Sequence, residues 1–360
     1  MKPSIGSAGD VSHPSPVVRD LFGSGEAANS SSDATEQPLD EVEAPAIGRV
    51  VKRLLGSREA ILDREPDQIG YQHTVLCQTS LPYRPTDARV WEREQGNVSL
   101  SVEAGRAWHP PTRKWVEMPL PHGEKPRLVL IHMNGEALRG GGPVIDVGDS
   151  MTAFVRTLGI DTNGRNLRTL KDQLGRLAAA TIRLAVSEDG RDMQINTHIV
   201  SAFDLWFPKD ENQRVLWPTT VRLSDEYFNS LTRHAVPLDN RAVGALSGSA
   251  LCLDIYCWLA QRLHRVSAHR PQVITWVALK GQFGVEYGRL DNFRTKFAPA
   301  LRAVLTVYPE AKVEIADVGL VLWNSPPPVS RRLIQGARVA PLIEGEAVRV
   351  GPPTGEKSGG

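Results

Sequence analysis

The sequence has no long hydrophobic run and only three cysteines among its 360 residues. No apolar stretch approaches the roughly 20 residues that span a bilayer, and no basic segment followed by an apolar core resembles a secretory signal. We therefore expect a soluble cytoplasmic protein. Cys77, Cys252 and Cys257 form neither a CxxC pair nor a Cys/His cluster with metal spacing, so buried reduced thiols are expected rather than a disulfide or a metal site.

Signatures of catalysis are also missing. An ATP-driven helicase needs G-x-x-x-x-G-K-[ST], and the segment 355–358 (GEKS) is only a fragment of it. A metal-dependent nicking enzyme of the rolling-circle type needs two histidines flanking one apolar residue, but the nine histidines include no such pair. His264 and His269 lie five residues apart with no third ligand in view. We expect no enzyme activity and no cofactor; a nuclease with clustered carboxylates stays open as an alternative.

The net charge of +1 hides an uneven distribution. Residues 1–46 carry eight acidic and two basic side chains, a net −6, which leaves +7 for the rest of the chain. A basic body with an acidic arm suits a polyanionic partner, from which the arm is repelled or with which it competes.

Composition and hydrophobic periodicity divide the chain into five parts. Residues 1–46 and 331–360 are rich in small and polar residues and predict a disordered acidic arm and a flexible tail. Residues 47–125 predict a helix and a β-rich lead-in packed on the first domain, with an alternating strand near 98–102. Residues 126–215 and 216–330 predict two α+β domains.

These two domains share one predicted order of elements. The first has a helix at 127–139, a strand at 143–146, helices ending at 158 and spanning about 163–181, and a hairpin over 182–199. The second repeats this order with a helix at 249–264, a strand at 272–274, helices at 275–283 and 290–307, and a hairpin over 311–323. A repeated order is harder to attribute to chance than either copy alone.

Helix, strand, helix, helix and hairpin is the order of a winged helix-turn-helix. In that fold the third helix enters the major groove of DNA and the hairpin contacts the backbone or a neighbouring groove. The order therefore predicts two tandem winged-helix domains that bind double-stranded DNA.

The third helix of the first domain has a leucine stripe and an opposite basic side. Leu167, Leu170, Leu174 and Leu177 share one side, and the candidate DNA-binding residues are Arg165, Arg168, Lys171 and Arg176. Arginine can grip phosphate or pair bidentately with guanine. Arg191, at the hairpin tip, is a further candidate. The alternative is a basic side that only meets solvent.

The corresponding helix of the second domain is basic but less regular. A stripe of large apolar residues predicts its buried side, and its candidate DNA-binding residues are Arg289, Arg294, Lys296 and Arg302. Pro299 must kink this helix or mark its first turn.

Several strings, in order and spacing, resemble one family. They are NGEALR (134–139), GDSMTAFVRTLGI (148–160), SALCLDIYCWLAQRL (249–263), W-x-x-L-x-x-QFG (276–284), FR-x-x-F (293–297), YPEAKVE (308–314) and GLVLWNSPPPV (319–329). Together they resemble the plasmid-encoded RepA replication initiator family over about residues 70–330, most densely from 245 onward.

The resemblance implies a bacterial replication initiator with two winged helices. Such a protein binds repeats at a plasmid origin, promotes melting of an A·T-rich region and recruits host proteins, including the replicative helicase; it can also form a homodimer. A winged-helix transcriptional repressor, using the same surface, is the alternative.

A short apolar patch in the acidic arm fits such a role. Val18-Arg19-Asp20-Leu21-Phe22 is similar to peptides ending in Leu-Phe by which replication proteins bind the sliding clamp, although the leading glutamine is missing. We take Asp20, Leu21 and Phe22 as candidate partner-binding residues, against the alternative that the patch has no role.

Overall fold

The structure is a computed structural model that describes residues 44–109, 112–146, 151–188, 191–197, 199–202, 220–330 and 333. The predicted arm up to residue 43, with Asp20, Leu21 and Phe22, lies outside the described residues, as does nearly all of the tail 331–360. The helix expected from 47 begins at Ala44. Among the described residues, no helix combines the length and apolar character needed to cross a membrane.

The described chain mixes helices with short antiparallel strands, which agrees with the expected α+β class. The helices are α2 (Ala44–Asp63), α3 (Thr74–Gln78), α4 (Glu124–Gly140), α5 (Met151–Thr157), α6 (Gly164–Ala179), α7 (Asp225–His234), α8 (Asn240–Ala245), α9 (Ala250–Arg262), the 3-10 turn η1 (Leu263–Arg265), α10 (Trp276–Phe283) and α11 (Leu290–Val307). The strands are β1 (Ile69–His73), β2 (Val90–Gln95), β3 (Val98–Glu103), β4 (Arg106–His109), β5 (Lys114–Glu117), β6 (Val144–Asp146), β7 (Thr181–Glu188), β8 (Arg191–Thr197), β9 (Val200–Ala202), β10 (Thr220–Leu223), β11 (Ala235–Asp239), β12 (Gln272–Thr275), β13 (Val313–Ala316) and β14 (Gly319–Leu322).

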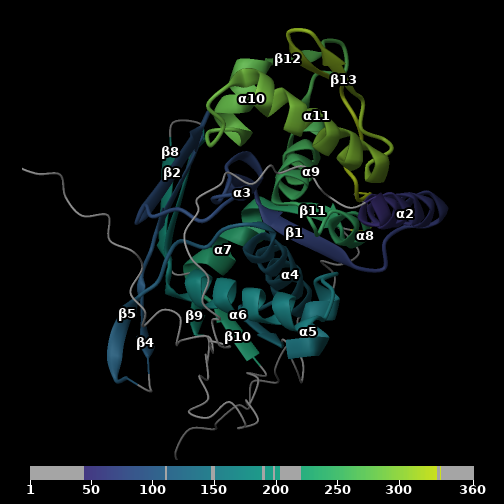
Figure 1. The fold of residues 1–360 in the computed structure, drawn as a ribbon. Coiled ribbons are helices and arrows are strands. Elements are labelled where there is room, and N and C mark those ends of the chain that lie inside the picture. Colours follow the sequence, from purple (N-terminus) through teal and green to yellow (C-terminus); the bar gives the residue numbers. More distant parts are fainter. Residues whose placement is uncertain are drawn as a thin grey trace, which may run out of the picture.

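We call α9, β12, α10, α11, β13 and β14 the second unit, and it follows the expected order of elements. The strand and the hairpin of this unit form one sheet in the order β12-β14-β13. Trp276, at the start of α10, ties the helices to this sheet, because its indole Nε1 donates to the Ala316 carbonyl at 3.2 Å. The unit occupies the top of the view in Figure 1.

We call α4, β6, α5, α6, β7 and β8 the first unit, and its sheet differs from the expectation. Strand β6 pairs with β10 rather than with the β7–β8 hairpin. The hairpin instead joins β2 and β3 of the lead-in, in the order β2-β3-β7-β8. The first unit therefore completes its sheets with strands from outside the predicted range 126–215.

The helix of the lead-in also packs elsewhere than expected. Helix α2 lies against α8 and α11, so it covers the second unit rather than the first domain. The guanidinium of Arg58 donates to the Thr306 carbonyl of α11 at 3.1 Å. Strand β1, from the same lead-in, pairs with β11 between the two units, along its whole length from Ile69 to His73.

A buried ion pair joins the first helices of the two units. Nε and Nη2 of Arg127 in α4 donate to Oδ1 and Oδ2 of Asp254 in α9, at 2.7 and 2.8 Å. Its other three N–H groups donate to the carbonyls of Leu81, Pro82 and Gly123, at 2.6–3.3 Å. All five guanidinium donors are thus satisfied in the interior, which removes the penalty for burying them unpaired.

Neutral polar side chains surround the same junction. Tyr227 donates to Asn134 at 3.0 Å, and His73 Nε2 lies 3.0 Å from the Ser230 hydroxyl. Burial, with a smaller contribution from His234, lowers the pKa of His73 to about 3, so this imidazole is neutral near neutral pH. The apolar side chains of both units belong to one continuous core around this junction.

Candidate nucleic-acid interface

Helix α6 of the first unit folds as its sequence pattern predicts. The Asn163 side chain accepts from the backbone N–H of Asn166 at 2.8 Å and so caps the helix. Leu170, Leu174 and Leu177 are buried, and their stripe fixes which side of α6 meets the core. The turn before α6 needs Gly159, which has a φ of +69°, and a Cβ there would lie 3.2 Å from the Gly244 backbone.

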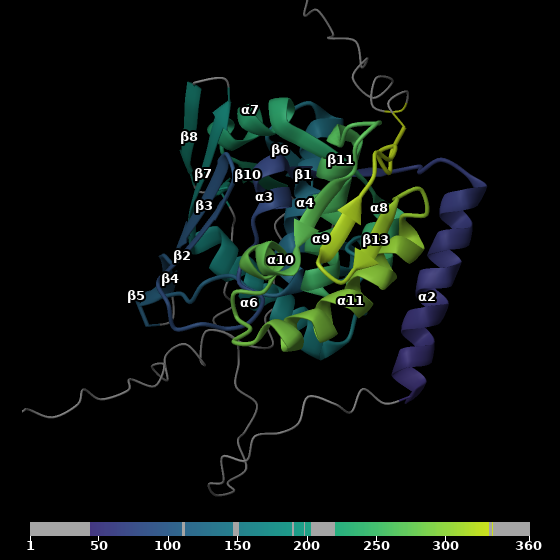
Figure 2. The same cartoon turned by 90° about the horizontal axis from the view of Figure 1, so that it is seen from above.

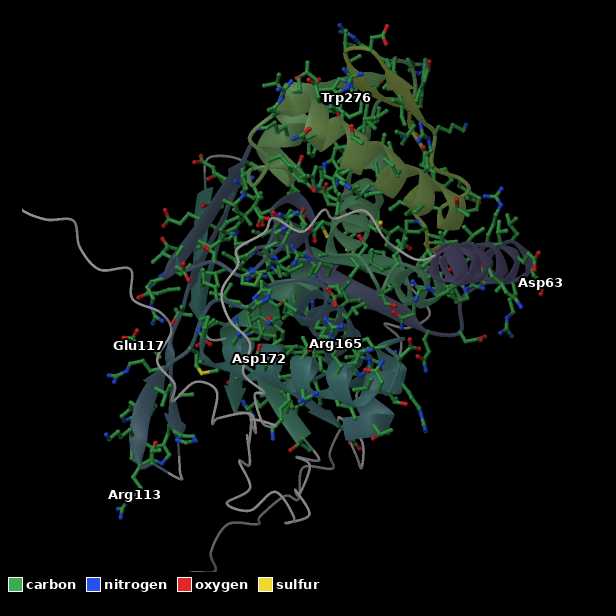
Figure 3. All side chains as sticks on the ribbon, in the orientation of Figure 1. Asp63, Arg113, Glu117, Arg165, Asp172 and Trp276 are labelled. Carbon is green, nitrogen blue, oxygen red and sulfur yellow. The ribbon has the colours of Figure 1, made fainter. Side chains whose placement is uncertain are left out.

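The first half of α6 presents its arginines to solvent. Arg165 and Arg168 are both exposed, and neither guanidinium forms an ion pair with a described residue. Lys171, on the flank, is half-buried, and burial lowers the pKa of its ammonium. In recognition helices of DNA-binding proteins the N-terminal residues usually reach base edges, and Arg165 and Arg168 lie in the first half of α6. Figure 3 marks Arg165 and Asp172 along this helix.

Arg176 is a correction to the predicted set. Its Nε lies 2.9 Å from Oδ2 of Asp172, with 15% of its side chain exposed, and its Nη1 lies 3.3 Å from Nδ1 of His122. The residues after β5 cover this side of α6, because Gln173 accepts from the His122 backbone at 2.8 Å. Burial first, and then the charge of Arg176, lower the pKa of His122. Helical phase could not reveal this cover, since it comes from a distant segment.

The structure describes the backbone of Arg191, the candidate at the hairpin, but not its side chain. Arg191 is the first residue of β8, opposite Glu188. Its side chain lies outside the described part of the structure, so its role stays a prediction.

Helix α11 of the second unit also follows the predicted stripe. Phe293, Phe297, Leu301 and Val304 are buried, and Pro299 lies exposed inside the helix. The proline thus marks neither the start nor the end of α11.

The cations of α11 have different surroundings. Arg289, Lys296 and Arg302 are exposed. The Arg289 guanidinium lies 3.5 Å from Asp291, but both side chains are at least three-quarters exposed, so water screens this pair. Arg294 is half-buried with its guanidinium 4.9 Å from the centroid of the Trp276 ring, which fixes its position on the helix.

The two basic helices, α6 and α11, lie at opposite ends of the molecule in Figure 1 and toward the same side of it in Figure 2. Figure 1 shows α6 at the bottom and α11 at the top, with α4 and α9 between them. Figure 2, seen from above, shows α6 and the first turns of α11 toward the same side.

The described residues offer no alternative centre of metal chemistry. No group of three or more His, Cys, Asp or Glu side chains among them is placed to hold a metal ion. Cys77, Cys252 and Cys257 are buried free thiols, as expected.

Sequence reasoning missed Arg127, whose partner lies 127 positions away; a lone arginine within an apolar helical run was the only local signal.

Comparison with known proteins gives one family and two solved structures. The family described as "Plasmid encoded RepA protein" matches residues 120–278. A crystal structure of a selenomethionine derivative of domains 2 and 3 of RctB is 10% identical, with a TM-score of 0.43, over 71% of this chain and 97% of that one. A second structure of RctB domains 2–3 is 11% identical, with a TM-score of 0.41, over 66% of this chain and 83% of that one. These backbones agree only loosely with the present fold.

No curated protein matches the chain. The family match spans α4 to the start of α10, so it includes α6 and the Arg127–Asp254 junction. It also contains three of the strings on which the resemblance was drawn, NGEALR, GDSMTAFVRTLGI and SALCLDIYCWLAQRL. Residues 120–278 of the chain are therefore similar to the plasmid-encoded RepA proteins.

Proposed function

We propose that this protein is a non-enzymatic replication initiator that binds repeated sequences in double-stranded DNA at a plasmid origin. The match of residues 120–278 to the plasmid-encoded RepA family supports the initiator role. The observation that carries the DNA contact is the first half of α6, where Arg165 and Arg168 are exposed and not ion-paired with described residues, next to a buried leucine stripe.

Each unit would then act as a winged helix. Helices α6 and α11 would enter successive major grooves, and the hairpins β7–β8 and β13–β14 would lie near the backbone. The second unit supports this interpretation most directly, because β12 joins its own hairpin in one sheet. Origin melting and recruitment of the host helicase, and of the sliding clamp through Asp20, Leu21 and Phe22, belong to the same proposal, as does a homodimer.

Footprinting on the DNA that flanks the gene tests the proposal. We expect protection of direct repeats beside an A·T-rich stretch, and permanganate reactivity of thymines in that stretch when the protein is bound. Protection of one inverted repeat over a promoter, without permanganate reactivity, would instead identify a repressor.

A second assay separates binding from cleavage. Supercoiled plasmid incubated with the pure protein and Mg²⁺ or Mn²⁺ should stay intact. Nicking that persists through purification would contradict the non-enzymatic proposal and favour a nuclease.

A further inference from the structure

The hairpin of β4 and β5 carries two tryptophans in solvent. Trp108 and Trp115 are direct partners in the register, and their ring centroids lie 5.7 Å apart at an interplanar angle of 65°. They are 43% and 58% exposed. Directly opposed residues of an antiparallel pair point to the same side, so both indoles lie on one face of the hairpin.

The other face attaches the hairpin to the body. Val116 and His109 are buried, and β4 contacts α6. His109 Nδ1 lies 2.6 Å from the Thr112 hydroxyl, which holds the hairpin end. Because these residues supply the attachment, the two indoles are left to face away from the core.

Two cations lie near the indole pair. Arg106, on the same face, and Arg113, at the tip, are exposed, and the Arg106 guanidinium donates to the Trp115 carbonyl at 3.3 Å. The acid of the hairpin, Glu117, lies 3.7 Å from Nη1 of Arg89, so its charge is offset. Arg113 has a φ of +51° at the tip of the hairpin, and Figure 3 shows its side chain directed away from the body.

Exposed aromatic rings framed by cations match the chemistry of unpaired nucleotides. A base whose partner strand has been removed offers a free π-face to stack on an indole, and the adjoining phosphates attract arginine and lysine. A base inside a duplex has both faces covered by its neighbours, so the same rings would gain little from it. The charge around the two rings is neutral to basic, so the hairpin does not repel a nucleic acid.

We propose that the β4–β5 hairpin is a binding site for single-stranded DNA, with bases stacking on Trp108 and Trp115 and phosphates near Arg106 and Arg113. Its contact with α6 places it beside the helix proposed to hold duplex DNA. A role in retaining one strand of an opened origin rests on that proposed function, whereas the binding of a single strand does not.

Fluorescence anisotropy with the full chain tests this site. The probes are a labelled 20-nucleotide thymidine oligomer and a labelled duplex carrying the footprinted repeat. Trp115→Ala and Trp108→Ala should each weaken binding of the oligomer about ten-fold, because stacking on one ring is lost. Trp115→Phe should retain most of the affinity, and the affinity for the duplex should change less than about two-fold.

Trp323→Ala is the matched control, because Trp323 is also 43% exposed but lies beside β14 of the second unit. An unchanged oligomer affinity in Trp115→Ala would overturn the proposal. So would an equal loss in Trp323→Ala, an equal loss on the duplex, or no oligomer binding by the unaltered protein. Failure of the unaltered protein to bind the duplex would contradict the proposed function instead, and the oligomer assay would still be interpretable.

Arg113→Glu provides a second variant if the alanine substitutions lower the melting temperature. Reversal of a charge at an exposed tip leaves the core intact and should weaken oligomer binding several-fold, with a shallower salt dependence. Oligomer binding unaffected by this reversal would also count against the site.

Discussion

In the second unit, β12 pairs with β14 of its own hairpin, whereas in the first unit β6 pairs with β10 and the hairpin pairs with β3. The order of helices and strands is nevertheless the same in both. One unit closes its sheet locally, and the other borrows strands from the lead-in and from the segment that follows it. A shared order of elements thus does not imply a shared sheet.

The two basic helices differ in a related way. The second half of α6 is covered by the segment around Leu120–His122, which withdraws Arg176 from the surface. Helix α11 keeps Arg302 exposed well beyond its middle. The covering segment comes from the lead-in, between β5 and α4, and it leaves the exposed arginines of α6 in the first half of the helix.

Breaking the buried pair between the units should have the largest effect. Arg127→Ala or Asp254→Ala leaves a charge buried without its partner, and we expect the free energy of unfolding to fall by about 3–5 kcal/mol. Urea unfolding followed by circular dichroism measures this loss. Because the pair joins α4 to α9, both units should unfold in one transition.

The double variant Arg127→Met with Asp254→Leu provides the control. It buries no charge and should recover much of the lost stability. A loss below about 1 kcal/mol in both single variants would show that the junction does not hold the units together.

Substitutions in the two sheets should show that the second unit completes its sheet with its own strands and the first unit with strands from outside it. Leu100 in β3 and Leu322 in β14 are both fully buried, so Leu100→Ala and Leu322→Ala should each cost about 2–5 kcal/mol. Amide hydrogen exchange should rise first in β7 and β8 for Leu100→Ala, because β3 pairs with β7. For Leu322→Ala it should rise first in β12 and β13. Faster exchange in β13 and β14 after Leu100→Ala, with β7 protected, would contradict the pairing described here.

Local patterns predicted most of the elements in the two units. The residues 290–307 expected as a helix are those of α11, and β7 and β8 pair as neighbouring antiparallel strands, as the Asp-Gly signal between them indicated. Hydrophobic period and turn residues act over a few positions, so one sequence suffices for them.

Partners distant in sequence could not be predicted in the same way. The pairing of β1 with β11 joins Ile69 to Asp239, and the buried pair joins Arg127 to Asp254. The lead-in was expected to be β-rich with one defined strand near 98–102, so β4 and β5 were not anticipated and the exposed tryptophans had no assigned role. In the candidate interface, the helical periodicity of α6 correctly placed Arg165 and Arg168 on its exposed side. It placed Arg176 there as well, because periodicity does not show which other segments cover a helix.

The salt dependence of DNA affinity tests most directly whether α6 and α11 both meet the duplex. The variants are Arg165→Ala with Arg168→Ala, Arg289→Ala with Lys296→Ala, and all four together. The control of equal charge is Arg64→Ala with Arg139→Ala, two exposed arginines outside these helices and outside both hairpins. The slope of log affinity against log salt concentration should become shallower by about two for each pair and about four for all, with little change in the control. An unchanged slope for either pair would contradict a DNA-binding surface made by both units.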